Sequence, residues 1–412
     1  MDDQHTATRA WHGHVPQTAG YRRLLAGLLL AGIATFAQLY SPQGLLPLIS
    51  ADVQISADQA ALLISMATAG LALAVIPWSF VGDRLGRKKA MAIALMAALI
   101  FAVASVVAPS FNLMLVFRLL EGISLGGVPA LAMAYLNEEV DRKYAGQTAG
   151  TYIAGTVIGG LIGRVIATPI GDWAGWRVGM LIVVVIAGIS GIGFLLLSPD
   201  ARGFMPSGHS IKHALVAITG NLKSPQLIVT YLQGMLLMGG FVAIYNFLGY
   251  HLMTEPFFLP AAVVSVIFWA YVMGIVTSPM AGRLATRYGP ATVLLAVSAA
   301  MVISVALTLV PNVWAILWGL IIFTGAFFAA HSVASGWAGA AAVAGRAQST
   351  ALYNLCYYAG SSLFGWLGGV LLDAHGWPGT VMMTIVLTLT AALLVVAVVI
   401  TRRIRHRRGQ VM

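Results

Sequence analysis

Charged residues are scarce in this chain: only 9% of its 412 residues are Asp, Glu, Lys or Arg. The surface of a soluble domain is about 25–35% charged residues. The composition therefore excludes the two or three soluble domains that the length alone would allow. Cysteine is nearly absent as well, and the single Cys356 excludes an intrachain disulfide.

Acidic residues are the scarcer of the two signs, with 13 against 23 Lys and Arg, and the formal net charge is +10. Such an excess can indicate a nucleic-acid partner. Here the basic residues lie between long apolar runs and at the two ends of the chain. We therefore expect no nucleic-acid partner and attribute the basic residues to membrane topology.

Three chemical signatures are missing. No Gly-x-x-x-x-Gly-Lys-Ser/Thr phosphate loop occurs, so ATP does not drive this protein directly. No hydrophilic segment is long enough to hold an active site, and we find no nucleophile–base set, so we expect that the protein is not an enzyme. No second His or Cys stands at ligand spacing, so we expect no metal site and no cofactor.

What the sequence has in abundance is apolar runs of about 20 residues, each long enough to span a bilayer. The first run is too long for the core of a signal peptide, so we expect it to remain as a span. The pattern predicts an all-α integral membrane protein. Its twelve predicted transmembrane helices are 24–46, 59–81, 90–108, 112–136, 147–169, 176–198, 227–250, 261–283, 290–310, 312–335, 348–371 and 379–400.

The positions of Lys and Arg predict the orientation. With a cytoplasmic N-terminus, all basic residues except Arg118, Arg164 and Arg177 fall in cytoplasmic segments, which is a strong positive-inside signal. Both termini are therefore predicted to be cytoplasmic. The predicted segments are a tail 1–23, a bundle 24–198, a linker 199–226, a bundle 227–400 and a basic tail 401–412. Residues 210–222 of the linker form either an interfacial amphipathic helix or part of a partly ordered segment.

The two predicted bundles repeat each other. "FAQLYSPQG" from residue 36 matches "FVAIYNFLG" from 241, and "YIAGTVIGGLIG" from 152 matches "YYAGSSLFGWLG" from 357, both at an offset of 205. Each copy of the latter is followed by an Asp and a Gly-Trp. A third match sets "DRLGR" from residue 83 beside "TRYGP" from 286, at an offset of 203. Three matches in order indicate two pseudo-symmetric six-helix bundles. Parallel halves of this kind place a central site at their interface and rock about it.

The stretch "GDRLGRKKA" from residue 82 resembles the loop motif of the major facilitator superfamily, Gly-x-x-x-Asp-Arg-x-Gly-Arg-Lys. The leading Gly is replaced by Ser79, and the second-half copy "GRLATRYG" has Thr286 in place of the Asp. The resemblance implies a cytoplasmic gate that joins the two halves, formed by Asp83, Arg84, Gly86, Arg87, Arg287 and Gly289. Asp83 can accept bonds from an Arg or a helix N-terminus, and Gly86 permits a tight turn. The alternative is that the bases only fix topology.

Three further stretches resemble the YnfM-type transporters of the acriflavine-sensitivity group within that superfamily: "YLNEEV" from residue 135, "FFAAHSVASGW" from 327 and "YYAGSSLFGWLGG" from 357. The resemblance covers the whole chain. It implies a monomer in the bacterial inner membrane that works by alternating access. It also implies a small-molecule substrate and transport driven by the proton gradient.

Ionisable residues inside the membrane are functional candidates because their burial costs about 2.5–3.5 kcal/mol or more each. In "RLLEGISLGG", Arg118 and Glu121 are three residues apart and can pair on one helix face. Arg118 also matches the superfamily's fourth-helix pattern, Arg-x-x-x-Gly, which the resemblance ties to proton coupling. We predict that Glu121 is the proton site and that Arg118 tunes it. The alternative is a static ion pair that stabilises the bundle.

The fifth span, "GTVIGGLIGRV", resembles the antiporter motif Gly-x-x-x-Gly-Pro-x-x-Gly-Gly. Gly155, Gly159 and Gly163 match and are predicted to pack closely against a helix of the other half. Gly160 replaces the Pro, and Arg164 replaces the last Gly. Arg164 has three possible roles: binding an anionic substrate, gating the outer mouth, or extending outward to the membrane surface.

Further candidates for the substrate cavity lie on the first, seventh and tenth spans. Gln38, Tyr40, Tyr245 and Asn246 are placed symmetrically and are either substrate contacts or aromatic packing and interface anchors. His331 is either packed by hydrogen bonds or a proton relay, for which its ordinary pKa is suitable.

The first hypothesis is therefore a proton-coupled secondary transporter that exports small organic or amphipathic compounds. The second is a carrier of an anionic metabolite that uses Arg118 and Arg164. A remote third is a membrane sensor that binds a ligand without transporting it, although the chain has no signalling domain.

Overall fold

The protein is all-α in a computed structural model that describes residues 11–141, 143–204 and 211–409. The first half contains α1 (Ala19–Tyr40), η1 (Gln43–Leu45), α2 (Leu46–Val53), α3 (Ala57–Leu85), α4 (Arg87–Val106), α5 (Phe111–Leu125), α6 (Gly127–Glu139), α7 (Ala145–Ala174) and α8 (Trp176–Leu197). After α9 (Ile211–Leu222), the second half contains α10 (Pro225–Met253), α11 (Ala261–Ser265), η2 (Val266–Val272), α12 (Met273–Tyr288), α13 (Pro290–Leu307), α14 (Val313–Ala340) and α15 (Arg346–Gly409).

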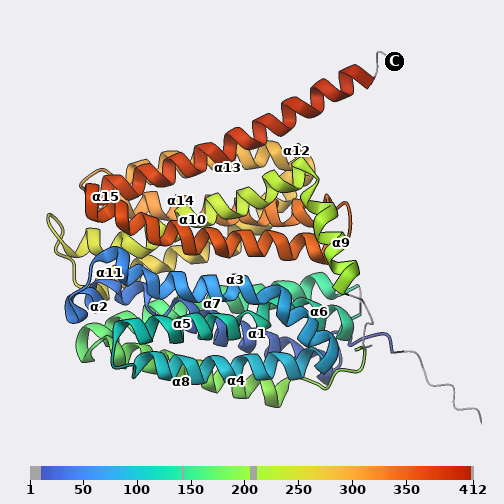
Figure 1. The fold of residues 1–412 in the computed structure, drawn as a ribbon, viewed down its shortest axis with the longest axis horizontal. Helices are drawn as coiled ribbons and strands as arrows, with labels where there is room; N and C mark the ends of the chain where they lie inside the picture. The colour runs from blue at the N-terminus through green and yellow to red at the C-terminus, as the bar shows by residue number, and fades with distance from the viewer. Residues whose placement is uncertain (1–10, 142, 205–210, 410–412) are drawn as a thin grey trace, which may run out of the picture.

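The two halves lie side by side with their helices running along the same axis (Figure 1). One end of the molecule carries α2 and the segment 254–260, and we call it the α2 end. The opposite end carries α9 and the loop 82–89, and we call it the α9 end. The described chain begins at the α9 end, and α15 also ends there.

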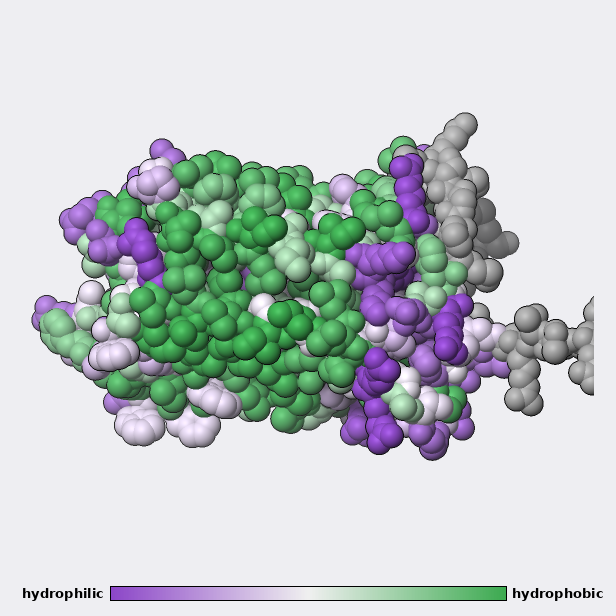
Figure 2. Space-filling view, turned by 90° about the horizontal axis from the view of Figure 1, so that it is seen from below, coloured by the Kyte–Doolittle hydropathy of each residue, from purple (hydrophilic) through white to green (hydrophobic). Residues whose placement is uncertain are grey.

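On the face shown in Figure 2, a broad band of apolar side chains lies between hydrophilic ends. Large apolar side chains are exposed on several helices, for example Ile100 of α4 and Ile189 of α8, which are 61% and 66% exposed. Exposed side chains of this kind are stable only in hydrocarbon. Among the described residues, 11 helices are long and apolar enough to cross a membrane. The predicted multi-pass membrane fold is confirmed.

The last of these candidates, Gln348–Thr401, has 54 residues and would be about 80 Å long as one straight helix. A bilayer core is only about 30 Å thick. The backbone breaks at Gly376, which has φ 64°, a conformation that glycine adopts at little cost. The break separates the two predicted spans 348–371 and 379–400, so the described residues contain twelve candidate spans.

Three of the predicted spans are not single helices in the structure. The first was predicted as one helix over 24–46, but α1 ends at Tyr40 and the chain resumes as η1 and α2. Pro42 stands at the break and lacks the N–H that would continue the helix. The fourth is split between α5 and α6, and the eighth between α11, η2 and α12. Several other helices are longer than the predicted apolar spans, because their ends extend into water.

The glycine stripe of α7 packs against α1. A Cβ added at Gly155, Gly159 or Gly163 would lie 2.5–2.7 Å from α1 backbone atoms, so only glycine permits this helix contact. The prediction that these glycines face the other half was wrong. The spacing predicts a close approach but does not identify the partner helix. The second half repeats this close helix contact. A Cβ at Gly360 of α15 would lie 2.0 Å from the Met235 carbonyl oxygen of α10.

The halves are joined at the α2 end. Among the described residues, the hydrogen bonds between the halves all lie at this end or in the adjoining part of the bundle: Gln43–Asn246, Leu46–Tyr250, Ser50–Tyr250, Asp58–Asp373, Asp172–Ala262 and Ser65–Ser362. The structure is therefore closed at the α2 end.

Two of these contacts are related by the repeat. Asp172 ends the fifth span and Asp373 ends the eleventh. Asp373 Oδ2 accepts the backbone N–H of Asp58 at 3.4 Å, in the first turn of α3. Asp172 Oδ2 accepts the N–H of Ala262 at 3.3 Å, in the first turn of α11. Each half thus places a carboxylate at a helix N-terminus of the other half, where negative charge is favourable.

Candidate functional site

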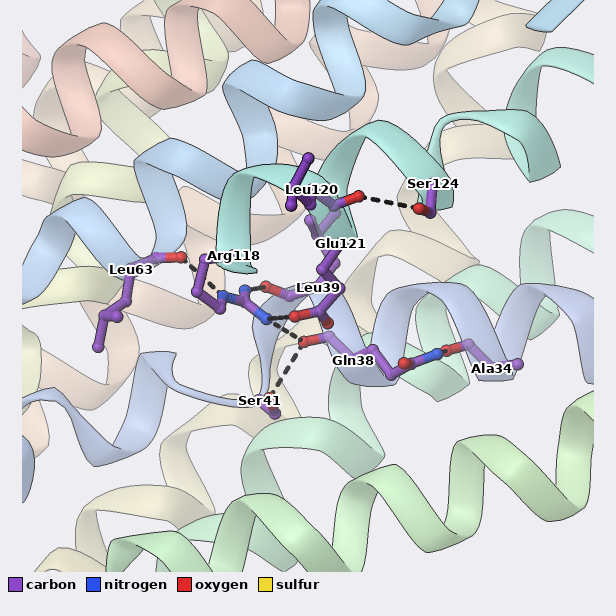
Figure 3. A network of polar contacts seen from close by, with 9 residues as sticks. All are labelled: Ala34, Gln38, Leu39, Ser41, Leu63, Arg118, Leu120, Glu121 and Ser124. Carbon is purple, nitrogen blue, oxygen red and sulfur yellow. Dashed lines mark hydrogen bonds and ion pairs between the residues drawn. The ribbon is translucent and has the colours of Figure 1, made fainter. Parts of the chain in front are cut away.

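The break at the end of α1 leaves backbone carbonyls without helical partners, and Arg118 of α5 binds them (Figure 3). Its Nη2 donates to the Leu39 carbonyl at 2.7 Å and its Nη1 to the Gln38 carbonyl at 3.3 Å. Its Nε donates to the Leu63 carbonyl of α3 at 2.9 Å. Arg118 therefore connects α1, α3 and α5, and it is only 1% exposed.

Glu121 lies one turn along α5 from Arg118, as the sequence predicted. Arg118 Nη1 donates to Glu121 Oε2 at 2.8 Å, and both side chains are 1% exposed. The other carboxylate oxygen, Oε1, is buried without a hydrogen-bond partner, and so is Oε1 of Gln38 in the same network. A buried carboxylate with one unpaired oxygen is costly and can accept a proton at that position.

Arg164 of α7 is also buried, at 1% exposure, so it does not extend outward to the membrane surface. Its guanidinium lies over the rings of Tyr40 at 4.3 Å, Tyr271 at 4.6 Å and Phe268 at 5.5 Å. Tyr40 belongs to the first half, whereas Phe268 and Tyr271 belong to η2 of the second half. Such cation–π contacts are worth about 2 kcal/mol or more when desolvated.

A chain of amides extends from Arg164 across the interface. Arg164 Nε donates to Gln43 Oε1 at 2.5 Å, and Gln43 Nε2 donates to Asn246 Oδ1 at 2.6 Å. Asn246 Nδ2 donates to the Gly365 carbonyl at 3.4 Å. Gln43, Arg164 and Asn246 are almost completely buried. Arg164 therefore lies within the closed contact between the halves.

The remaining cavity candidates lie in an aromatic cluster of the second half. Tyr245 shares a hydrogen bond with Thr324 at 2.5 Å, and its ring lies 5.5 Å from that of Phe268. His331 Nδ1 is 2.9 Å from the Tyr353 hydroxyl, and its ring stacks on Phe327 at 6.2 Å. Both positions fit the packing interpretation.

The loop 82–89 carries the predicted gate residues, and the first-half copy is the more strongly bonded. Arg87 pairs with Asp83 at 2.6 Å and with Glu138 of α6 at 2.9 Å, and it lies 5.7 Å from the ring of Phe204. Gly86 has φ 85°, which supports the predicted tight turn. These contacts stay within the first half and the beginning of the linker. In this conformation the motif therefore does not join the two halves.

The other gate residues lie on the surface. Arg84 is exposed and lines a hollow of about 360 Å³. In the second-half copy, Gly289 has φ 85° and ends α12, whereas Arg287 is exposed with its guanidinium 5.1 Å from the Tyr288 ring. The repeat thus keeps the turn geometry in both halves but not the ion pairs.

The linker is fixed at both described ends. Glu139 Oε1 accepts the backbone N–H groups of Arg202 and Gly203, each at 2.7 Å. Lys88 pairs with Asp200 at 2.9 Å, and this ammonium holds the pKa of Asp200 below its usual range. On the other side, the predicted linker helix is present as α9. Its Asn221 bonds to the backbone of 343–344 in the second half.

Several residues of the site were not predicted. Gln43, Phe268 and Tyr271 have no motif that distinguishes them from ordinary membrane residues. Asp172 and Asp373 did carry a signal, because the repeat places an Asp before a Gly-Trp in both halves. Within the described part of the chain, no group of three or more His, Cys, Asp or Glu could hold a metal ion.

Comparison with known proteins identifies the family. The Major Facilitator Superfamily model matches residues 28–276 and 253–410. The inner membrane transport protein YnfM of Escherichia coli is 36% identical over 391 residues, covering 95% of this chain and 92% of YnfM. The MFS-type transporter YybF of Bacillus subtilis is 34% identical over 375 residues, covering 91% of this chain and 93% of YybF.

Solved structures share the fold. A mutant of the nucleoside transporter NupG has a TM-score of 0.71 at 16% identity, covering 91% of this chain and 99% of that chain. A D-xylose-proton symporter has a TM-score of 0.70 at 16% identity, covering 92% of this chain and 96% of that chain. The protein is a multi-pass membrane transporter and not an enzyme. Its sequence and fold together place the chain in the major facilitator superfamily of secondary transporters.

Proposed function

We propose that this transporter exchanges protons for small organic or amphipathic compounds and exports them, with Glu121 as the proton site. One observation carries this proposal. Glu121 is a buried carboxylate with one oxygen paired to Arg118 and the other without a partner. Such a group is costly when charged and gains from protonation, while the adjacent guanidinium favours the charged form.

Protonation of Glu121 would act on the interface through Arg118. Arg118 binds the two carbonyls at the end of α1 as well as Glu121. A proton on Oε1 removes the negative charge of Glu121 and so weakens the charge-assisted bond from Nη1 to Oε2. The end of α1 leads directly into Gln43, which bonds to Asn246 of the second half. Proton binding can therefore change the contact that closes the α2 end.

With the predicted cytoplasmic termini, the α2 end faces outward and the structure is the inward-facing state. The loop 82–89 then lies on the open side, which explains why its charges bond to α6 and the linker instead of the second half. We propose that Asp83, Arg87 and their neighbours join the halves only in the outward-facing state. The fold of a D-xylose-proton symporter supports proton coupling as a property of this architecture.

The second candidate is a carrier of an anionic metabolite, and one observation favours it. Arg164 is a buried cation held by neutral groups and aromatic rings. Arg118 does not fit this role, because its nitrogens are bonded to three carbonyls and Glu121. An anion carrier would therefore depend on Arg164 alone.

The test is dye efflux from energised cells, with cationic acriflavine and anionic fluorescein measured in parallel. Wild type and Glu121→Gln are compared, each with and without a protonophore. Efflux that needs both the gradient and Glu121 is the expected result. Efflux that needs the gradient but survives Glu121→Gln would move the proton site elsewhere. Efflux of fluorescein alone would favour the anion carrier.

A further inference from the structure

Arg164 is a buried positive charge without a negative partner. Among the ion pairs formed by the described residues, none includes Arg164. Its hydrogen bonds go to the neutral Gln43 amide and to the Gly160 carbonyl. A buried cation is usually stabilised by an acid, because desolvation costs several kcal/mol. Arg118 has such an acid in Glu121. The bundle therefore contains one buried arginine with an acidic partner and one, Arg164, that is not in any ion pair of the described residues.

Gly160, one turn before Arg164 on α7, leaves room for this guanidinium. A Cβ built on Gly160 would meet only Arg164 Nη1, at 3.0 Å, within a radius of 4 Å, yet Gly160 is buried. Among the described residues, no side chain other than Arg164 therefore packs at this position of α7. The same observation explains why the two departures from the antiporter motif occur together. Glycine at 160 allows Arg164 to fold back along its own helix, whereas a larger side chain would crowd Nη1.

The aromatic rings that contact the Arg164 guanidinium come from both halves. Tyr40 belongs to the first half, and Phe268 and Tyr271 belong to the second. A guanidinium presents a fork of donors that matches a carboxylate, and aromatic walls favour an apolar body. A site at the interface of the halves is also where a transporter of this type binds its substrate.

We propose that Arg164 is the substrate-selecting residue and that it binds the carboxylate of a small aromatic acid between Tyr40, Phe268 and Tyr271. This inference rests on the proposed transport function but not on Glu121 as the proton site. The carboxylate takes the donors that Arg164 now gives to Gln43 and Gly160. Gln43 then loses the bond that orients it toward Asn246. Anion binding therefore weakens the contact that closes the α2 end.

The test measures binding to the purified full-length protein by isothermal titration calorimetry. Three probes of one shape are compared: benzoate, neutral benzamide and benzylammonium. We expect benzoate to bind at least about tenfold more tightly than either of the others, since one charge-assisted bidentate pair is worth that much. Arg164→Gln should reduce benzoate affinity by a similar factor. Arg177→Gln is the matched control, because Arg177 is a half-exposed arginine at the α2 end.

Arg164→Lys keeps the positive charge but loses the forked donors of the guanidinium. This variant replaces Arg164→Gln in the test if Arg164→Gln does not fold. We expect it to bind benzoate at least about threefold more weakly than wild type. Equal benzoate affinity in the wild type and both variants would overturn the proposal, as would tighter binding of benzylammonium than benzoate. Absence of benzoate binding at 10 mM, about the weakest affinity the method resolves, would also overturn it. These outcomes are independent of Glu121, so proton coupling can fail in the efflux test while this site stands.

Discussion

Replacing Asp172 with alanine should shift the transporter away from the state in which the α2 end is closed. Asp172 on α7 accepts the backbone N–H of Ala262 at 3.3 Å, at the N-terminus of α11 in the other half. The contact exists only while the two halves touch at this end. Its loss therefore destabilises the closed state and leaves the open state unchanged.

The magnitude follows from the geometry. A hydrogen bond to a charged group contributes about 1.5–3 kcal/mol, but this one is long and Asp172 is exposed, so about 0.5–1 kcal/mol is expected. That corresponds to about a two- to fivefold change in the ratio of closed to open molecules. Asp373→Ala should have a smaller effect, because it also removes the repulsion between Asp373 and Asp58.

The populations can be measured by double electron–electron resonance between spin labels on Val107 and Leu309. Both residues are exposed on helix-connecting segments, one in each half. The chain makes labelling simple, because Cys356 is its single cysteine and Cys356→Ser removes it. Asp52→Ala is the control, since the bonds of Asp52 go to Trp176 and Arg177 in its own half. An equal shift in Asp52→Ala and Asp172→Ala, or no shift in either, would refute the reasoning.

Three further predictions concern stability and are checked by thermal melting of the purified protein. Gly159→Ala should lower the melting temperature through about 1–3 kcal/mol of overpacking, since its Cβ would lie 2.7 Å from α1. A Cβ at Gly150 would have no neighbour within 4 Å, so Gly150→Ala should be neutral or stabilising by up to about 1 kcal/mol. Equal changes of melting temperature in the two variants would contradict the packing account. Glu121→Ala should cost about 3–5 kcal/mol because it leaves the buried Arg118 charge without an acidic partner; an unchanged melting temperature would contradict the ion pair's role. Asn221→Ala should cost about 0.5–1.5 kcal/mol, because it removes the hydrogen bonds from the backbone N–H groups of 343 and 344. An unchanged melting temperature would contradict that role for the linker.

The apolar runs predicted the membrane fold well, because each span must satisfy its backbone internally and must match the bilayer thickness. The breaks within spans were harder to predict. The carbonyls at the end of α1 are satisfied by Arg118, which lies about 80 residues away in the sequence. A local pattern cannot show that a distant side chain will stabilise a broken helix end.

The candidate site was predicted in part for a similar reason. Arg118 and Glu121 are three residues apart, so helix geometry alone predicts their pairing. The surroundings of Arg164 depend on η2, more than 100 residues further along the chain, and no spacing rule connects them. The glycine stripe shows the same limit, because a close approach was predicted correctly but was assigned to the wrong helix.

The central claim is that transport moves a proton through Glu121. It is tested most directly by proton flux in proteoliposomes that contain a pH-sensitive dye, started by adding a transported substrate from the efflux assay. The account predicts a substrate-dependent pH change with wild type and none with Glu121→Gln, although that variant still exchanges labelled for unlabelled substrate. A substrate-dependent pH change of unaltered size with Glu121→Gln would contradict it.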